Sequence, residues 1–439
     1  REVVAVLRRA VDALADAGQL VIGALRNRDN FGGSNYAGAV LTRFAIGDNP
    51  SDGSGLSVAT LKKSGFGNVS VTATNDVTLT GNLELPELGV LRLQSENAAV
   101  TLGGSVRVAG GQVVLRSLNA DVQVARQTRI DVSGAWVNNA LDPSFAVSAP
   151  VAATTGGSLS LRAAGNLILG GDNVLDVSGG GQVTSAGGLT GGAAGSVTLL
   201  AGTARSAFNL SPLQLQLGNA ELRGYSLTQG GSLSLTAPQI RFGNAAAAPE
   251  PVGGLRLDND FLNRGGFQSF ALNGRESLSV DPGVTLAPRL QLWQPNAASR
   301  NAPSGSRTAD LFSAGLQTLS LPKPVNLSLS SSGFSASDPQ GRLSIAAGAV
   351  IDLDPTATLS LAALNQLRLD GRIVAPGGKV SLGLTGNGNV LQPRLLWIGG
   401  SAGIDVAGLR QLQPSSDGLL TGRVLAGGGI SLSTFSGTV

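Results

Sequence analysis

The chain contains no cysteine, no histidine and no methionine among its 439 residues. Without cysteine there are no disulfide bonds, so the folded state must be stabilised by its core alone. Without histidine or cysteine, Ser-His-Asp and Cys-His nucleophilic sites are excluded. Only oxygen ligands remain for a metal, which restricts any metal site to ions such as Ca²⁺ or Mg²⁺. Because the chain begins at Arg1 and carries no methionine, we expect it to derive from a longer protein.

Aromatic and charged residues are also scarce. Charged residues make up 13% of the chain and aromatic residues 4%, whereas ordinary globular domains have about a quarter charged residues. The chain is nevertheless 42% hydrophobic and has 63 glycines, which favours a repeating β architecture with a polar, weakly charged surface. The net charge of +3 comes from scattered arginines without a dense basic run, so we predict no nucleic-acid binding.

We find no signal peptide and no apolar run of about eighteen residues, so we predict no membrane-spanning segment.

Short alternating runs dominate what the chain does contain. Residues 156–181 read GGSLSLRAAGNLILGGDNVLDVSGGG, in which LSL, LIL and LDV each place apolar residues at alternate positions. This alternation predicts half-buried strands. From residue 69 such runs recur every six to nine residues, near residues 70, 78, 84, 92, 101, 107, 114, 123 and 131. Three runs therefore take about 22 residues, as in one coil of a solenoid.

The predicted fold is all-β, a parallel β-helix with about three short strands per coil. A sandwich or a barrel is the alternative, but both need hairpins with strands of about five or six residues. They also need two-residue turns such as Asn-Gly, which are scarce here. We expect the β-helix to occupy residues 67–439, with large loop insertions near residues 138–155, 244–254 and 294–326. The glycine run at residues 179–195 is a further predicted loop.

The first part of the chain has a different pattern. Val3, Leu7, Val11 and Leu14 fall at helical spacing, so residues 1–26 are predicted to form a short amphipathic helix or a linker. Residues 27–66 are dense in turn-forming residues and read as an irregular lead-in, with one strand possible at residues 39–44.

Carboxylates give two candidate sites. The stretch GGDNVLDVSGGG resembles the calcium-binding nonapeptide of β-rolls, but it does not repeat in tandem, so we interpret its glycines as turns. Asp352 and Asp354 alternate with apolar residues and are expected to point outward about 6.7 Å apart, which suits an acid and base pair of a polysaccharide hydrolase or lyase. The competing interpretation is a solvated repeat position, because Asp131, Asp176 and Asp405 follow the same pattern in other coils.

Aromatic side chains are the remaining candidates. Tyr36, Trp136, Trp293 and Trp397 could stack on sugars, but the last two lie in apolar runs, and packing in the core or at a coil edge is the preferred interpretation. We therefore predict no catalytic residue, no cofactor-binding residue and no metal ligand.

Four stretches carry a resemblance to a known family. These are residues 64–86 (SGFGNVSVTATNDVTLTGNLELP), residues 156–181, residues 348–382 (GAVIDLDPTATLSLAALNQLRLDGRIVAPGGKVSL) and LLWIGGSAGIDVAG with the later TGRVLAGGGISLS. They resemble the repeats of filamentous-haemagglutinin-type exoproteins, and the resemblance covers most of residues 56–439. It implies a right-handed β-helix, secreted through the outer membrane of a Gram-negative bacterium by a partner transporter. The family's N-terminal secretion domain is not recognisable, so the chain resembles an internal repeat region.

The resulting expectation is a structural shaft and adhesive surface, secreted or displayed at the bacterial cell surface, that binds an unidentified glycan or host protein. It is not expected to be an enzyme or to carry a cofactor. Two alternatives remain open. One is the stalk of a contact-dependent toxin-delivery protein, with its effector beyond Val439. The other is a β-helical polysaccharide-degrading enzyme.

Overall fold

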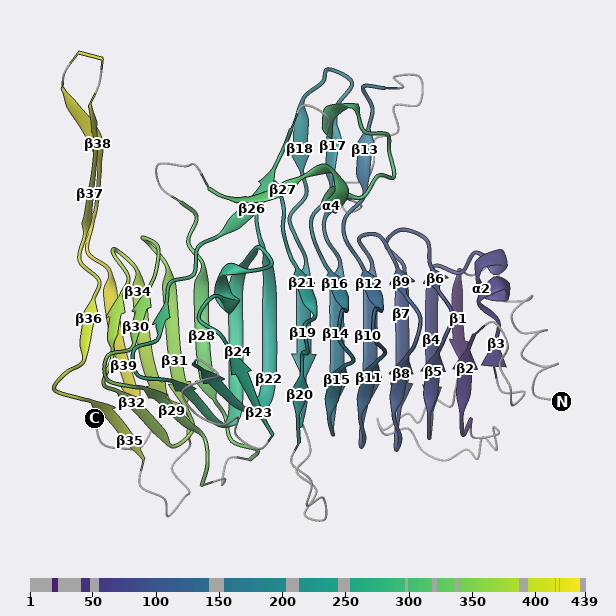
Figure 1. Cartoon of the computed structure of the whole chain (residues 1–439), viewed down its shortest axis with the longest axis horizontal. Helices are drawn as coiled ribbons and strands as arrows, with labels where there is room; N and C mark the ends of the chain where they lie inside the picture. Colours follow the sequence, from purple (N-terminus) through teal and green to yellow (C-terminus); the bar gives the residue numbers. More distant parts are fainter. Residues whose placement is uncertain are drawn as a thin grey trace, which may run out of the picture. The chain divides into compact units, whose positions relative to one another are not determined.

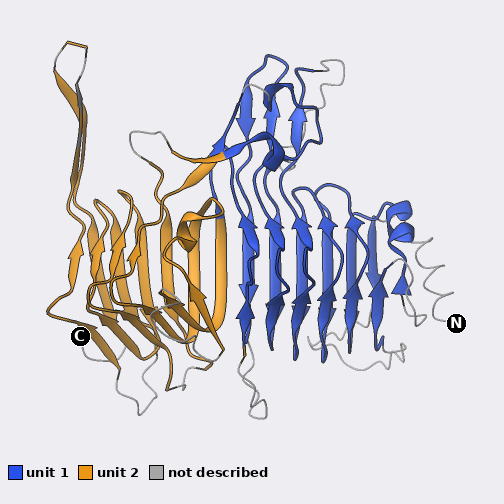
Figure 2. Ribbon diagram, in the orientation of Figure 1, with its two compact units in different colours: residues 1–206, 214–231, 293–313 blue, residues 207–213, 232–292, 314–439 orange. Residues whose placement is uncertain are grey.

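The computed structural model describes residues 18–22, 41–47, 55–141, 154–202, 213–243, 253–296, 299–317, 322–335, 339–386, 394–414, 416–417 and 419–434. The chain divides into two compact units (Figure 2). Unit 1 comprises Arg1–Ser206, Gln214–Gly231 and Trp293–Ser313, and unit 2 comprises Ala207–Leu213, Ser232–Leu292 and Ala314–Val439. Both consist mainly of parallel β-sheets, so the all-β prediction with parallel strands is confirmed.

Unit 1 contains three parallel sheets, and the chain visits them in turn (Figure 1). Within the unit, the first sheet has the order β1-β4-β7-β10-β14-β19, the second β20-β15-β11-β8-β5-β2-β3 and the third β21-β16-β12-β9-β6. The strands are β1 Gln19–Ile22, β2 Phe44–Ile46, β3 Gly55–Leu56, β4 Asn68–Ala73, β5 Val77–Leu79, β6 Leu83–Glu84, β7 Val90–Ser95, β8 Val100–Leu102, β9 Val106–Arg107, β10 Gln112–Ser117, β11 Val122–Val124, β12 Arg129–Asp131, β14 Ser158–Ala163, β15 Leu167–Leu169, β16 Val174–Asp176, β19 Ser196–Leu200, β20 Leu215–Gln216 and β21 Glu221–Arg223.

The nine runs predicted between residues 70 and 131 coincide with strands β4 to β12. Asn68 of β4 lies beside Val90 of β7, and Val90 lies beside Gln112 of β10, so the register advances by 22 residues (90 minus 68 and 112 minus 90). This is the predicted spacing. It arises because two successive strands of one sheet are separated by one strand in each of the other two sheets.

The core of unit 1 is made of in-register columns of aliphatic side chains. Val71, Leu93, Leu115, Leu161 and Leu199 occupy equivalent positions in five successive strands of the first sheet and have no exposed surface. Alternation along each strand places these residues on the inner face and polar residues on the outer face. Burial of repeated Val and Leu side chains therefore replaces the disulfide bonds that the sequence cannot form.

A column of glycines precedes the strands of the first sheet. A methyl group on Gly157 would overlap the carbonyl oxygen of Gly111, and one on Gly195 would overlap the carbonyl oxygen of Gly157. The recurring glycine before each strand is therefore explained by the close approach of successive backbones at this corner. The Gly156–Gly157 pair lies immediately before β14.

The N-terminal prediction needs a correction. Gln19–Ile22, expected within a helix, form strand β1 and pair with β4 in parallel. Leu20 and Ile22 are buried while Gln19 and Val21 are exposed, which is a strand period that the helical pattern upstream obscured. Residues 1–17, on which the helix was predicted, lie outside the described residues. A helix does form at Val58–Ser64 (α2), inside the predicted lead-in, where the Ser57 hydroxyl accepts from the Thr60 amide as an N-cap.

The predicted loops at residues 179–195 and 294–326 contain ordered structure. In unit 1, a small sheet joins β13 (Trp136–Asn138) to β17 (Gly181–Val183) in parallel, and β17 to β18 (Leu189–Gly191) as an antiparallel pair. The short helices η4 (Ser299–Asn301) and α4 (Thr308–Leu311) come from the second segment. The segment interpreted as linker-like is therefore partly folded, because Ala302 and Phe312 are buried against Trp136, which lies far away in sequence. Residues 142–153 and 244–252 of the other insertions lie outside the described residues.

Unit 2 repeats the parallel pattern. One sheet has the order β22-β24-β28-β31-β34-β39, β29 pairs with both β24 and β32, β35 pairs with β32, and another sheet has the order β25-β30-β33-β36. Strands β37 and β38 form an antiparallel hairpin between β36 and β39. The strands that lie wholly or partly in unit 2 are β22 Gly231–Phe242, β23 Gly254–Leu257, β24 Phe267–Val280, β25 Thr285–Leu286, β26 Gln291–Gln294, β27 Ser313–Leu316, β28 Asn326–Ser331, β29 Arg342–Ile345, β30 Val350–Asp352, β31 Thr358–Ala363, β32 Gln366–Leu369, β33 Arg372–Val374, β34 Lys379–Leu384, β35 Leu395–Ile398, β36 Gly403–Asp405, β37 Leu409–Pro414, β38 Leu420–Leu425 and β39 Gly429–Thr434, with η3 at Phe261–Asn263.

Candidate functional site

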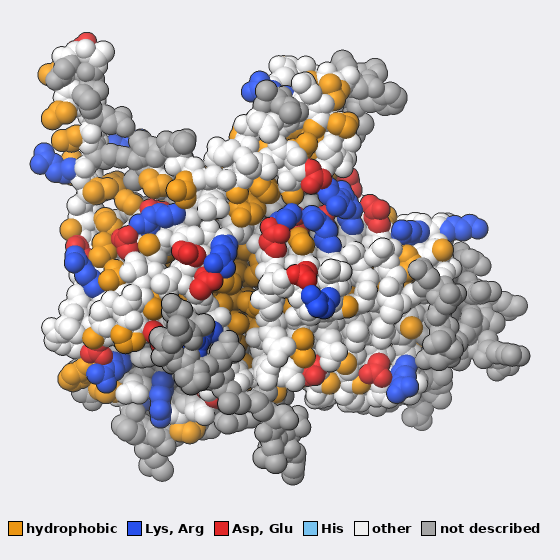
Figure 3. Space-filling model, viewed as in Figure 1, with side chains coloured by type: hydrophobic (Ala, Val, Ile, Leu, Met, Phe, Trp, Pro, Cys, Tyr) orange, Lys and Arg blue, Asp and Glu red, His pale blue; other side chains and the backbone are white. Residues whose placement is uncertain are grey.

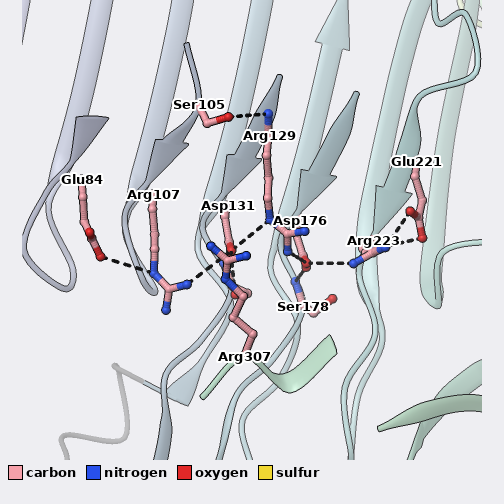
Figure 4. Close-up of polar contacts among 11 residues, drawn as sticks. Glu84, Ser105, Arg107, Arg129, Asp131, Asp176, Ser178, Glu221, Arg223 and Arg307 are labelled. Atoms are coloured by element: carbon pink, nitrogen blue, oxygen red, sulfur yellow. Dashed lines mark hydrogen bonds and ion pairs between the residues drawn. The ribbon is translucent and has the colours of Figure 1, made fainter. Parts of the chain in front are cut away.

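A column of charged residues follows the third sheet of unit 1 (Figure 4). We call Glu84, Arg107, Asp131, Asp176 and Arg223 the charge column, because parallel register places them side by side on β6, β9, β12, β16 and β21. The order of charges is acid, base, acid, acid, base. Two carboxylates are therefore adjacent at the centre of the column, between two arginines.

The two central carboxylates are almost fully buried. Asp131 is 2% exposed and Asp176 is 1% exposed. They lie on the opposite face of their strands from Ile130 and Leu175, so the predicted outward direction holds, but the predicted solvation is wrong. Arginine side chains cover this position.

Arg129 joins the two carboxylates. Its Nε donates to Oδ2 of Asp131 at 3.3 Å, and its Nη2 donates to Oδ2 of Asp176 at 3.0 Å. The guanidinium fork suits this bridge because it presents several donors in one plane. One arginine therefore satisfies two acids on neighbouring strands.

Three further arginines surround the pair at longer range. Arg107 and Arg307 each have a guanidinium nitrogen 3.8 Å from Oδ2 of Asp131, and Arg223 has one 3.9 Å from Oδ2 of Asp176. Arg307 belongs to the segment beside α4, so that segment adds a charge to the column. The cations outnumber the two buried acids, which is how a low-dielectric position can hold both carboxylates.

A turn motif follows both acids. In the two DVSG segments, Oδ1 of Asp131 accepts from the Ser133 amide and Oδ1 of Asp176 accepts from the Ser178 amide, each at 3.1 Å. The Ser133 hydroxyl also donates to Asp131 at 2.6 Å. An Asp side chain that binds the backbone two residues ahead is an Asx turn. The recurring I/L-D-V pattern is therefore a strand-ending turn.

The environments shift the two pKa values in opposite directions. For Asp131, burial acts to raise the pKa, but the Ser133 hydrogen bonds and the charges of Arg129 and Arg107 outweigh it and lower the pKa. For Asp176, burial and repulsion from Asp131 raise the pKa, and the Ser178 hydrogen bonds and Arg129 offset this only in part. Two acids with separated pKa values are typical of acid–base sites. These two are covered by protein on all sides, so a substrate cannot reach them.

The predicted acid pair Asp352 and Asp354 forms a second cluster, in unit 2. Arg289 contacts both acids: Nη2 lies 2.7 Å from Oδ2 of Asp352 and Nε lies 3.3 Å from Oδ1 of Asp354. The side chain of Asp352 is 39% exposed and that of Asp354 only 9%, so the expectation that both point into solvent is wrong for Asp354.

Asp354 is the less satisfied of the two acids. Its Oδ2 is buried and has no hydrogen-bond partner among the described residues. Burial raises the pKa of Asp354, Arg289 lowers it and Asp352 raises it again, with a net increase. This cluster pairs a half-exposed carboxylate with a buried acid whose pKa is raised, the arrangement that a general acid needs.

The predicted calcium loop does not gather carboxylates. Asp172 binds Arg126 at 3.0 Å and also contacts the Asn219 amide, and these two hydrogen bonds lower its pKa. The Asn173 side chain is buried and donates to the Ala125 carbonyl at 2.6 Å. Within the described residues, no group of three or more acidic side chains could hold a metal ion.

The aromatic candidates fall into three situations. Trp136 and Trp293 are buried in what we call the aromatic cluster, which consists of Trp136, Val183, Trp293, Ala302 and Phe312. The rings of Trp136 and Phe312 meet edge to face at 5.5 Å, and the Trp136 indole donates to the Ala302 carbonyl at 3.2 Å. Core packing is therefore confirmed for these two tryptophans. Trp397 is 48% exposed, and Tyr36 lies outside the described residues.

The outer face of unit 2 carries a row of hydroxyls. Ser328, Ser360, Ser381 and Ser431, which we call the serine row, are in register on β28, β31, β34 and β39. Strand spacing places them about 4.8 Å apart.

On the face in Figure 3, acidic and basic side chains lie interspersed, so that face has no large area of a single charge sign.

Comparison with known proteins does not add an identity. No protein-family model, no curated protein and no solved structure matches the chain. None of the described helices is long and apolar enough to cross a membrane. The arginines around the two buried acids, Arg107, Arg129 and Arg223, were not predicted from the sequence. A signal existed, since Arg107, Arg129 and Arg223 lie in the third run of their coils, as the repeated Asp does.

Proposed function

We propose that the protein is the structural shaft and adhesive surface of a secreted exoprotein of the filamentous-haemagglutinin type, acting at the bacterial cell surface. In this proposal the parallel sheets belong to a right-handed β-helix, a solenoid with three short strands per coil. A partner transporter in the outer membrane exports the chain, and a glycan or host protein is the ligand.

The observation that carries the proposal is the unbroken register of the first sheet in each unit. Strands β4 to β14 repeat the same column positions coil after coil, and β28, β31, β34 and β39 do so in unit 2. In such a fold each coil buries its apolar residues against its neighbours only. An architecture of this kind can be extended without limit, which suits a spacer. The absence of cysteine is compatible with export in an unfolded state.

The serine row supports the adhesive part of the proposal. Hydroxyl groups both donate and accept hydrogen bonds, as sugar hydroxyls do. On one side of the row the neighbouring outward positions, Ala362 and Gly383, are small, and on the other side Lys379 adds a positive charge beside Ser381. A flat hydroxyl surface of this kind favours an extended polar ligand.

Attachment of the purified chain to immobilised glycans, matrix proteins and fixed cells tests the proposal. We expect retention, and we expect it to fall at least about tenfold when Ser360 and Ser381 are both replaced by Lys, because long charged side chains would block the row. Lysines at Ser70 and Thr198, which are outward positions on the first sheet of unit 1, are the matched control. If the unmodified chain is retained on none of these surfaces, the adhesive function is wrong.

The stalk of a contact-dependent toxin-delivery protein is the first alternative. It shares the β-helix and the export route, but its ligand contacts serve delivery of an effector. A toxin module encoded after Val439 would favour this alternative over an adhesin.

The Asp352–Asp354 cluster favours the second alternative, a polysaccharide-degrading enzyme. In it Asp354, with a raised pKa, would protonate the leaving oxygen, and Asp352 would act as base or nucleophile. Incubation with a panel of polysaccharides, with detection of new reducing ends, tests this. Cleavage that disappears in Asp354→Asn and Asp352→Asn would establish the enzyme and displace the shaft as the main function.

A further inference from the structure

The turn that follows β30 contains an Asp–Pro peptide bond and a strained residue. Asp354 and Pro355 begin the turn, which is closed by the Ala357 amide donating to the Asp354 carbonyl oxygen at 3.2 Å. Proline at the second position and a positive φ at the third define a type II turn, in which the third residue is normally glycine. Here the third residue is Thr356, with a φ of 69°. A β-branched side chain rarely adopts this conformation, so the turn is strained at Thr356.

The carboxyl group of Asp354 is only half used. Its side chain is 9% exposed, and Oδ1 lies 3.3 Å from Nε of Arg289. Oδ2 is buried without a hydrogen-bond partner among the described residues. Arg289 and Asp352 are the charged groups that act on it, and burial raises its pKa in spite of Arg289. The protonated form of this side chain is therefore favoured, with one oxygen that no other group holds.

A second Asp–Pro turn in unit 2 provides a comparison. Residues 281–284 form the same turn, closed by the same backbone hydrogen bond at 3.3 Å. There Nε of Arg241 binds both carboxylate oxygens of Asp281, each at 2.8 Å. The residue with positive φ is Gly283, which adopts this conformation without strain. Of these two turns, only the one at Asp354 combines an unheld carboxyl oxygen with a strained backbone.

We propose that the Asp354–Pro355 bond is a self-cleavage site, at which the Asp354 side chain breaks its own main chain. In the first step, the hydroxyl oxygen of the protonated carboxyl group forms a bond to the main-chain carbonyl carbon of the same residue. Its proton passes to the Pro355 nitrogen, and the bond between that carbon and the nitrogen breaks. The products are a five-membered cyclic anhydride at Asp354 and a secondary amine at Pro355. One water molecule then opens the anhydride to two carboxyl groups, so the net reaction is hydrolysis of one peptide bond.

The surroundings of the bond favour both steps. The nucleophile and the carbonyl belong to one residue, so their reaction is intramolecular. The Ala357 amide already donates to the carbonyl oxygen on which negative charge develops. Breaking the bond opens the turn and releases the strain at Thr356. Because Pro355 is half-buried and Thr356 is exposed, water can reach the anhydride.

Strands on both sides of the bond are held by parallel pairing. β30 pairs with β25 and β33, and β31 pairs with β28 and β34. The cleaved chain should therefore keep its fold, and its two fragments should separate only after denaturation. The inference is independent of the proposed adhesive function, because attachment to a surface does not require the cut.

Mass spectrometry of the full chain tests the inference. The folded chain is incubated in heavy-oxygen water at neutral and at mildly acidic pH, and samples are denatured before measurement. We expect fragments 1–354 and 355–439 to form at least about tenfold faster than any cleavage between Asp281 and Pro282. Part of the heavy oxygen should enter the side-chain carboxyl of Asp354, because water can open the anhydride at either carbonyl. Direct attack of water on the peptide bond would label only the main-chain carboxyl.

Two substitutions remove different parts of the reaction. Asp354→Asn removes the carboxyl O–H and should abolish the cut. Pro355→Ala keeps the carboxyl but replaces the secondary amine by a primary one, and should slow the cut at least about tenfold. Asp281→Asn is the matched control and should cleave at Asp354 as the unmodified chain does. Circular dichroism establishes that each variant is folded.

Four results would overturn the inference. The first is an unmodified folded chain that forms no fragments, and the second is equal cleavage at the two Asp–Pro bonds, which would be ordinary acid lability. The third is heavy oxygen confined to the main-chain carboxyl, which would exclude the anhydride. The fourth is cleavage that persists in folded Asp354→Asn, which would place the nucleophile elsewhere.

Discussion

Asp131 and Asp176 lie side by side on neighbouring parallel strands, and a single guanidinium, that of Arg129, binds both carboxylates. Like charges directly opposite one another normally destabilise a sheet. Here the arrangement is tolerated because the pair is enclosed by four arginines and by two Asx turns. Its energetic consequences can be measured in several independent ways.

Arg129→Met should destabilise the protein by about 3 kcal/mol at neutral pH, because it leaves two buried carboxylates without their shared donor. Thermal or chemical denaturation measures the change. The matched control is Arg126→Met, which breaks an ion pair whose side chains are 72% and 40% exposed. It should cost far less than Arg129→Met, because solvent screens an exposed ion pair. Equal effects of the two substitutions would contradict the bridging role of Arg129.

The two acids should respond to pH with opposite signs. The folded pKa of Asp176 is raised above its ordinary value of 3.8, so the folded state holds this proton more tightly than the unfolded state. Ionisation of Asp176 therefore costs stability as pH rises from 3.8 through the raised pKa. Asp176→Asn should gain stability relative to the unmodified chain across this window, as measured by melting temperature against pH.

Asp131 has a lowered pKa, so its contribution is present above 3.8 and is lost as pH falls through the lower folded value. Asp131→Asn should therefore be destabilising at neutral pH, and the difference from the unmodified chain should shrink below about pH 3.8. A difference that does not change with pH would mean that the Asp131 carboxylate is not the stabilising group.

Gly157→Ala should cost about 2–3 kcal/mol, because the added methyl group meets the carbonyl oxygen of Gly111 and both groups are backbone-anchored. Gly67→Ala is a matched control in the same column. A methyl group there meets only the Gly18 carbonyl at 3.8 Å, an ordinary contact. The comparison of denaturation midpoints separates close backbone approach from the general effect of removing a glycine.

Trp136→Ala should open the aromatic cluster while the three sheets of unit 1 stay folded. The substitution removes the ring that packs on Phe312 and the donor to Ala302, at a cost of about 3–5 kcal/mol. Hydrogen exchange should show faster exchange in residues 299–313 and unchanged protection in β10 and β14. Loss of protection throughout unit 1 would show that the cluster is part of the main core.

Much of the sheet architecture could be predicted because strand alternation is a local signal. The runs at β4 to β12 were located to within a residue or two, and Leu or Val at every second position is enough for that. The burial of Asp131 could not be predicted in the same way. One of the arginines around it is Arg307, which is 176 residues away in sequence (307 minus 131) and lies between Ala302 and Phe312 of the aromatic cluster.

The same distinction explains the other errors. β1 was missed because its four residues follow a stretch with helical spacing, and only its pairing with β4 makes it a strand. The acids Asp352 and Asp354 were expected to be equivalent because they alternate along the chain. Asp354 lies past the end of β30, where alternation no longer determines which side chains are buried.

The register of 22 residues from β4 through β7 to β10 has a consequence for how such a chain can change in length. Deleting residues 90–111 would bring Asn68 of β4 against Gln112 of β10 and leave every aliphatic column continuous. The same deletion would remove Arg107 and set Glu84 against Asp131. Recombination can therefore add or remove a whole coil at little cost to the packing of the core. Whether a given coil can be removed depends on which charged residues then become neighbours in the third sheet.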